Sequence, residues 1–223
     1  MPDSIVILGS PTALGGHVGG MERTPAELRR AGLVDRLRAQ PGLRDTTLVD
    51  AGDAANEPGW AADPDPRAKN RALIAAYLPR LAAATEAAMA GARGGDADGA
   101  TAARRLHVIG GDCTTHAGVM AGLRHALGAR LGRPARLAIA WFDAHGDFNT
   151  PATTPSGNVW GMPFAMLLGR GDPDLVVACD GPTATEEDAA ILGGQVLDEQ
   201  ESRMLAASRV AHFGAGMLAT EAG

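Results

Sequence analysis

LAIAWFDAHGD, the sequence of residues 137–147, indicates both the fold class and the place of a candidate site. Its first half is a continuous apolar run, which is typical of a buried central strand in a parallel sheet. Its second half contains Asp143, His145 and Asp147, whose side chains would leave an extended chain on one side. Two carboxylates and an imidazole at the carboxyl end of a strand predict a site for a divalent metal ion. The alternative is that these carboxylates cap a helix or a loop.

Strand-like and helix-like segments alternate along the rest of the chain. Apolar runs that predict further strands occur at residues 4–8, 46–50, 106–109, 189–192 and 210–213. Helices are predicted at residues 24–39, 67–93, 114–131, 162–168 and 199–207, with a possible break at Pro79. Residues 169–187 show no clear pattern. This alternation predicts one α/β domain over residues 1–223, with a parallel sheet and helices on both of its faces.

Composition narrows the classes of partner and location. A chain of 223 residues that is 45% hydrophobic and 21% charged can bury an ample core. Its net charge of -6 gives no reason to expect nucleic acid or an anionic membrane as a partner. No apolar run reaches the roughly 20 residues that a membrane span needs. Asp3 stands where a signal peptide would be basic, and Cys113 and Cys179 make no disulfide framework, so a cytoplasmic protein is expected.

Three motifs follow one another along the chain, and together they suggest a family. They are GGDCTTH at residues 110–116, WFDAHGDFNTP at 141–151 and TTPSGNVWGMP at 153–163. This series resembles the arginase/agmatinase (ureohydrolase) family, in which the corresponding segments read GGDH, DAHxDxN and SGNxHGMP. The glycine-rich segment at 15–33, with its proline-led helix, is similar to the family's N-terminal part. The resemblance covers nearly the whole chain.

The resemblance implies a fold, a reaction and a set of partners. The fold would be a three-layer α/β/α domain with a mainly parallel sheet. The site would hold two manganese ions bridged by a hydroxide, which adds to the guanidinium carbon of the substrate and leads to urea and an amine. The substrate would be arginine or a close analogue such as N-hydroxyarginine. The family also implies a homo-oligomer, a trimer or a hexamer.

The resemblance also assigns roles to individual residues. Positions that match metal ligands are Asp143, His145 and Asp147, with Cys113 at the position of a further ligand. Positions that match or adjoin substrate contacts are Asn149 and Ser156 at the amino-acid end, Asn158 in the same loop, and Asp198 at the substrate's amino group. Asp198 has an alternative role as a helix N-cap, because Glu201 follows three residues later.

Two substitutions depart from the family pattern within these motifs. Cys113 replaces the histidine of GGDH, and a thiolate is a soft ligand, whereas manganese prefers oxygen and nitrogen. Some relatives that act on N-hydroxyarginine-type substrates are similar in having a cysteine here; the alternative is a small buried cysteine. Trp160 replaces the histidine that shuttles protons in arginases. Proton transfer would then need another group or solvent, at a cost of ~10²-fold, or Trp160 would wall a pocket for another substrate.

A third departure concerns the ligands that the family takes from later in its sequence. The family supplies two ligands from a D-x-D motif and a further glutamate, but no aspartate follows Asp198 here. The expectation is therefore a fold that lacks its last strands and a doubtful second metal site. Two alternatives to an active enzyme follow, a non-catalytic homologue that acts as a binding or structural partner and a truncated product. His17, in the glycine-rich loop, either faces the site or is an ordinary loop histidine.

Overall fold

The computed structural model describes residues 3–55, 65–90 and 104–218. The strands are β1 (Ser4–Ser10), β2 (Thr47–Asp53), β3 (Arg104–Gly110), β4 (Ile139–Asp143), β5 (Ala189–Gly193) and β6 (Ala211–Phe213). The helices are α1 (Thr24–Arg30), α2 (Leu33–Arg38), α3 (Arg71–Ala90), α4 (Thr115–Leu131), α5 (Pro163–Leu167), α6 (Pro173–Ala178), α7 (Glu199–Ala206) and α8 (Ala215–Leu218). No helix in these ranges is long and apolar enough to cross a membrane.

The strands are parallel, as predicted, but they form two sheets. Each has three strands, in the orders β2-β1-β3 and β4-β5-β6, and no ladder joins β3 to β4 among the described residues. The central strand of the first sheet is β1, where Val6 and Ile7 are fully buried. The expectation that residues 137–147 form a central strand is wrong for the described chain. β4 is an edge strand there, and the Phe142 side chain on its second face is 74% exposed.

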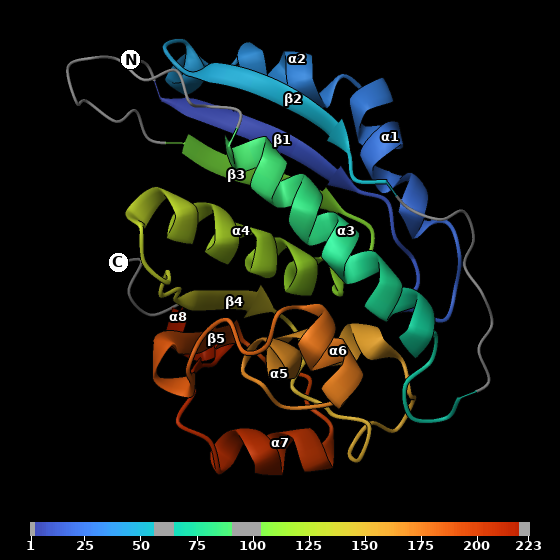
Figure 1. Cartoon of the computed structure of the whole chain (residues 1–223). Helices are drawn as coiled ribbons and strands as arrows, with labels where there is room; N and C mark the ends of the chain where they lie inside the picture. The colour runs from blue at the N-terminus through green and yellow to red at the C-terminus, as the bar shows by residue number, and fades with distance from the viewer. Residues whose placement is uncertain (1–2, 56–64, 91–103, 219–223) are drawn as a thin grey trace.

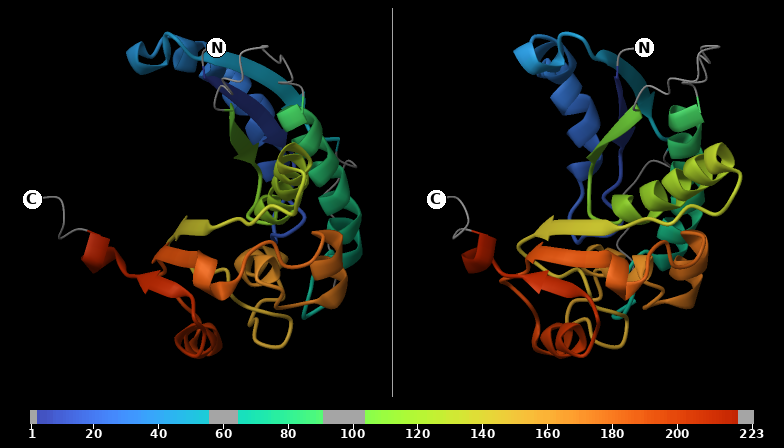
Figure 2. Two further views of the ribbon diagram at one scale, coloured as in Figure 1. Left: turned by 60° about the vertical axis from the view of Figure 1, so that its left-hand side comes forward. Right: turned by 90° about the vertical axis from the view of Figure 1, so that its left-hand side faces the viewer.

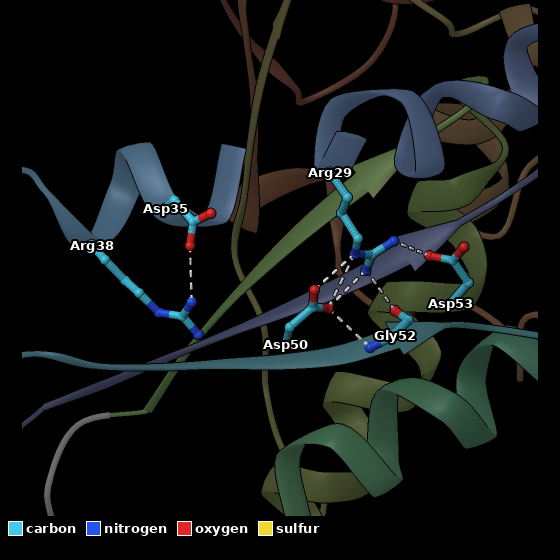
Figure 3. Close-up of polar contacts among 6 residues, drawn as sticks. All are labelled: Arg29, Asp35, Arg38, Asp50, Gly52 and Asp53. Atoms are coloured by element: carbon cyan, nitrogen blue, oxygen red, sulfur yellow. Dashed lines mark hydrogen bonds and ion pairs between the residues drawn. The ribbon is translucent and has the colours of Figure 1, made fainter. Parts of the chain in front are cut away.

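Helices cover both faces of the first sheet. Figures 1 and 2 show α1 and α2 on one face and α3 with α4 on the other. Arg29 of α1 ties its helix to β2, because it pairs with Asp50 at 2.9 Å and with Asp53, and donates to the Gly52 carbonyl at 2.9 Å (Figure 3). The hydrogen bond from Arg29 lowers the pKa of the Asp50 carboxyl, so this link is strongest when Asp50 is ionised.

Close contact between α3 and α4 fills the space behind the first sheet. A Cβ at Gly122 would lie 2.3 Å from the Ala82 carbonyl oxygen, so only glycine lets these helices approach so closely. Leu78 and Leu81 of α3 are fully buried in the same cluster. Helix α3 runs through Pro79 without a break. Helix α4 begins two residues after Cys113, so this packing holds the helix that follows Cys113.

The second sheet packs against α5 and α7. Trp141 of β4 lies 5.3 Å from Phe164 of α5, and Phe148 lies 5.7 Å from the same ring. Ile191 of β5 and Leu205 of α7 complete the cluster. The loop after β4 is therefore anchored on an aromatic core immediately beside its carboxylates.

The boundaries of two helical regions differ from the prediction. The helix predicted at 24–39 is two helices, because Gly32 adopts a left-handed conformation with φ of 81° and redirects the chain. Residues 169–187, which had no assignment, contain α6. The Asp172 side chain accepts hydrogen bonds from the first backbone N–H groups of this helix. The end of the helix predicted at 67–93 lies partly outside the described residues.

Candidate metal centre

Three of the four predicted metal ligands come together where the two sheets meet. Cys113 follows β3 of the first sheet, Asp143 ends β4 of the second, and Asp147 lies in the loop after β4. One ligand atom from each of these residues lies within 4.8 Å of the other two. Because parallel strands direct their carboxyl ends to one edge, two strands far apart in the sequence supply one cluster.

A turn, and not strand alternation, places Asp147 beside Asp143. The strand stops at Asp143, and the Asp143 and Ala144 carbonyls accept hydrogen bonds from Gly194 and Val196, each at 2.8 Å. Asp147 itself has a φ of 46°, in the left-handed region. The argument that an extended chain would present Asp143, His145 and Asp147 on one side is therefore wrong, although two of these residues do converge.

His145 lies outside the cluster. Its side chain is 61% exposed, and its Nδ1 is 3.4 Å from Asp143 Oδ1. The backbone N–H of His145 donates to the same oxygen at 2.9 Å. The described geometry therefore makes His145 a neighbour of one ligand, and its role as a metal ligand stays a prediction.

The electrostatics of the cluster favour a bound cation. Burial, followed by the nearby charge of Asp143, raises the pKa of Asp147 to about 8. Burial also raises the pKa of the Cys113 thiol above its ordinary value, and the charges of Asp147 and Asp143 raise it further. Asp147 Oδ2 is buried and has no hydrogen-bond partner among the described residues. A divalent ion would replace the proton, satisfy this oxygen and relieve the repulsion, so the donor set fits such an ion.

Glu201 holds the loop that carries Asp147, a role that sequence reasoning missed. Its side chain accepts from Phe148 N at 2.8 Å and from Asp198 N at 3.3 Å, and the residue is 3% exposed. The second bond belongs to the capping box of α7, so the alternative role of Asp198 as a helix N-cap is confirmed, and its contact with the substrate stays a prediction. The D-x-x-E spacing was a signal for the cap, but nothing in it indicated the long-range bond to Phe148.

The predicted substrate contacts form two separate pairs. Asn149 Nδ2 donates to Asp198 Oδ2 at 2.9 Å, so these two residues, 49 apart in the sequence, are neighbours. Ser156 Oγ accepts from Asn158 N at 3.2 Å in the loop before α5. The Asn158 side chain then contacts a lysine that no motif had indicated, because Lys69 Nζ donates to its Oδ1 at 3.3 Å.

Trp160 lies against the glycine-rich loop. Its backbone N–H donates to the Gly15 carbonyl at 3.0 Å, and a Cβ at Gly16 would lie 2.6 Å from its ring. The His17 ring stands edge-on to the indole at a centroid distance of 5.0 Å, and His17 Nδ1 lies 3.4 Å from Asn158 Nδ2. His17 therefore contacts two residues of the third motif, and both interpretations of its role stay predictions.

The fold and the cluster define an α/β protein with a candidate divalent-metal site, and comparisons with known proteins identify its family. The arginase family profile matches residues 3–220. Arginase from Bacillus caldovelox is 33% identical over 205 residues, which cover 90% of this chain and 61% of that protein. Arginase-1 from Rattus norvegicus is 34% identical over 168 residues, or 75% of this chain and 45% of that protein. The chain belongs to the arginase family.

Solved structures agree with this assignment. The structure of the Bacillus caldovelox arginase at pH 5.6 matches with a TM-score of 0.78 and 29% identity, over 98% of this chain and 67% of that one. The predicted family and the arginase-like α/β fold are therefore confirmed. The chain spans less than two thirds of the length of the two curated relatives above, at 61% and 45%.

Proposed function

We propose that this chain carries the metal-binding and substrate-binding residues of an amidinohydrolase, which releases urea from the guanidino group of arginine or a close analogue. The observation that carries the proposal is the cluster of Cys113, Asp143 and Asp147, in which the buried Asp147 has an unsatisfied oxygen, in a chain of the arginase family. N-hydroxyarginine is the analogue that the cysteine at position 113 favours.

Asp143 and Asp147 would hold a manganese ion, with Cys113 as a third donor. Such an ion, when bound, supplies Lewis acidity and lowers the pKa of a water molecule that it holds. Three clustered donors suit one ion better than two, so a second ion, with His145 as its ligand, would need donors beyond this cluster. The thiol at Cys113 weakens the preference for manganese, because a soft ligand suits other metals better.

The residues around the cluster would orient the substrate. Asn149 and Asp198, which are hydrogen-bonded to each other, would bind its amino group. Ser156 and Asn158 lie in one loop and would bind its carboxylate. Trp160 has an indole N–H, which donates a hydrogen bond but does not exchange its proton near neutral pH. Trp160 would therefore form a wall of the site and would not transfer a proton.

A non-catalytic role is the second candidate. The exposed ring of His145 and the indole at Trp160 favour it. An active enzyme would need the imidazole of His145 at the metal and a second imidazole, at position 160, near the leaving amine. The protein would then bind a metal or a partner without turnover. Assembly into a trimer or hexamer and a cytoplasmic location remain predictions under either function.

One experiment separates the two functions. The purified protein is loaded with Mn²⁺, bound metal is measured by elemental analysis, and urea release is measured with arginine, N-hydroxyarginine and agmatine. Bound metal with urea release supports the amidinohydrolase. Bound metal without urea from any of the three supports the non-catalytic homologue. Failure to bind metal contradicts the site itself.

A further inference from the structure

Lys69 is the only lysine of the chain, and the structure places it on the loop of the predicted substrate contacts. Its backbone N–H donates to the Gly157 carbonyl at 2.9 Å, and its Nζ donates to Asn158 Oδ1 at 3.3 Å. Gly157 has a φ of 72°, and a Cβ there would lie 2.3 Å from the Pro66 carbonyl oxygen. Backbone contacts therefore fix Lys69 against this loop, and its position does not depend on its side chain alone.

The charge of Lys69 is not neutralised within the described parts of the chain. No carboxylate there lies within ion-pair distance of its Nζ, whereas Arg71, two residues later, pairs with Asp172 at 3.2 Å. An ammonium group has three donors, and the Asn158 amide oxygen occupies one of them. Lys69 is partly buried and Asn158 is 7% exposed, so an anion that arrived here would be little screened by water.

The metal cluster has the opposite charge to Lys69. Asp143 and Asp147 bring two carboxylates together in that cluster. A substrate that carries a cationic group at one end and an anionic group at the other would match this arrangement in one orientation only. Electrostatic complementarity of this kind contributes mainly to specificity.

We propose that Lys69 is a specificity-determining residue that binds the carboxylate of the substrate, with the Asn158 amide holding its ammonium group in place. The proposal rests on the proposed function and deepens it, because it makes an anionic tail a requirement for tight binding. Asn158 then acts as a positioning residue, and the segment just before α3 becomes part of the substrate site.

The test uses binding, so that it does not depend on turnover. L-ornithine and putrescine have the same amine chain, but only L-ornithine has a carboxylate. Their affinities for the Mn²⁺-loaded full chain are measured by titration calorimetry for the wild type, Lys69→Met and Lys69→Arg. The control is Arg67→Met, which removes a nearby cation that donates to the Pro151 carbonyl. Thermal unfolding shows whether each variant is folded.

We expect Lys69→Met to weaken L-ornithine binding about 10-fold or more, because a charge-assisted contact is lost, and to leave putrescine binding unchanged. Lys69→Arg should retain most of the affinity for L-ornithine, and Arg67→Met should change neither ligand. Equal loss of both ligands, no loss of either, or no preference of the wild type for L-ornithine would overturn the proposal. Urea release from agmatine, which has no carboxylate, reports on the proposed function separately.

Discussion

The metal end of the candidate site brings two carboxylates together, whereas the Lys69 end holds one amide and a cation. At the metal end, Asp147 is buried beside Asp143, and its pKa rises to about 8. At the other end, Lys69 and His17 both contact the Asn158 amide, which has no charge. Under the proposed function, the crowded acids would select a cation, and the partly buried ammonium group would select an anion.

Removing one acid should have the largest effect on this contrast. We expect Asp143→Asn to lower Mn²⁺ affinity about 100-fold or more, because the variant loses both a ligand and the negative charge that a divalent ion requires. The control is Asp174→Asn, an exposed carboxylate with a side chain that is 71% accessible. Unchanged metal content in Asp143→Asn, measured by elemental analysis after dialysis, would mean that the metal binds elsewhere.

Replacing the Cys113 thiol with a nitrogen donor should strengthen Mn²⁺ binding. We expect Cys113→His to raise Mn²⁺ affinity about 10-fold, since imidazole suits manganese better than a soft thiolate does. Cys113→Ser is the matched control, because it removes the sulfur without adding a nitrogen donor. Competition titration with a metal-sensitive dye would measure both, and equal affinities for the histidine variant and the wild type would exclude Cys113 as a ligand.

The stability of the metal-free protein should depend on pH through Asp147. Its pKa is about 8 in the fold against an ordinary 3.8, so the folded state holds this proton more tightly than the unfolded chain does. The stability that results is complete below the ordinary value and is lost as the pH rises toward about 8. We expect the Tm of the metal-free protein to fall over this window and Mn²⁺ to oppose the fall.

Asp147→Asn cannot ionise, so it should lack this decline. Differential scanning fluorimetry of the wild type, Asp147→Asn and the control Asp174→Asn at several pH values would compare the slopes. Identical slopes for the wild type and Asp147→Asn would show that another group causes the pH dependence.

Loss of the loop support should have the smallest effect. Glu201→Ala leaves the Phe148 and Asp198 N–H groups without their acceptor, and we expect a loss of about 1–3 kcal/mol in the free energy of unfolding. Glu199→Ala, on the exposed side of α7, is the matched control and should change stability little. Urea denaturation measures both, and equal effects would mean that Glu201 has no special role in holding the loop.

Local patterns were enough to predict much of the molecule. Apolar runs and cap signals depend on neighbouring residues, and they predicted the six strands, the α/β class and the cap at Asp198. The three motifs at residues 110–116, 141–151 and 153–163 were sufficient to predict a family that the comparisons confirm. The split at Gly32 was missed because a helical pattern continues on both sides of it, while its left-handed conformation is a property of the folded backbone.

By itself, the amino-acid sequence determined the fold class, the family and the residues available for a metal, because these follow from residue type and short spacing. Only the tertiary structure decided which residues meet. It placed His145 outside the cluster, bonded Phe148 to Glu201 across 53 positions, and brought Lys69 to Asn158 across 89. Such contacts depend on how two sheets and their loops pack, and no periodicity along the chain records that arrangement.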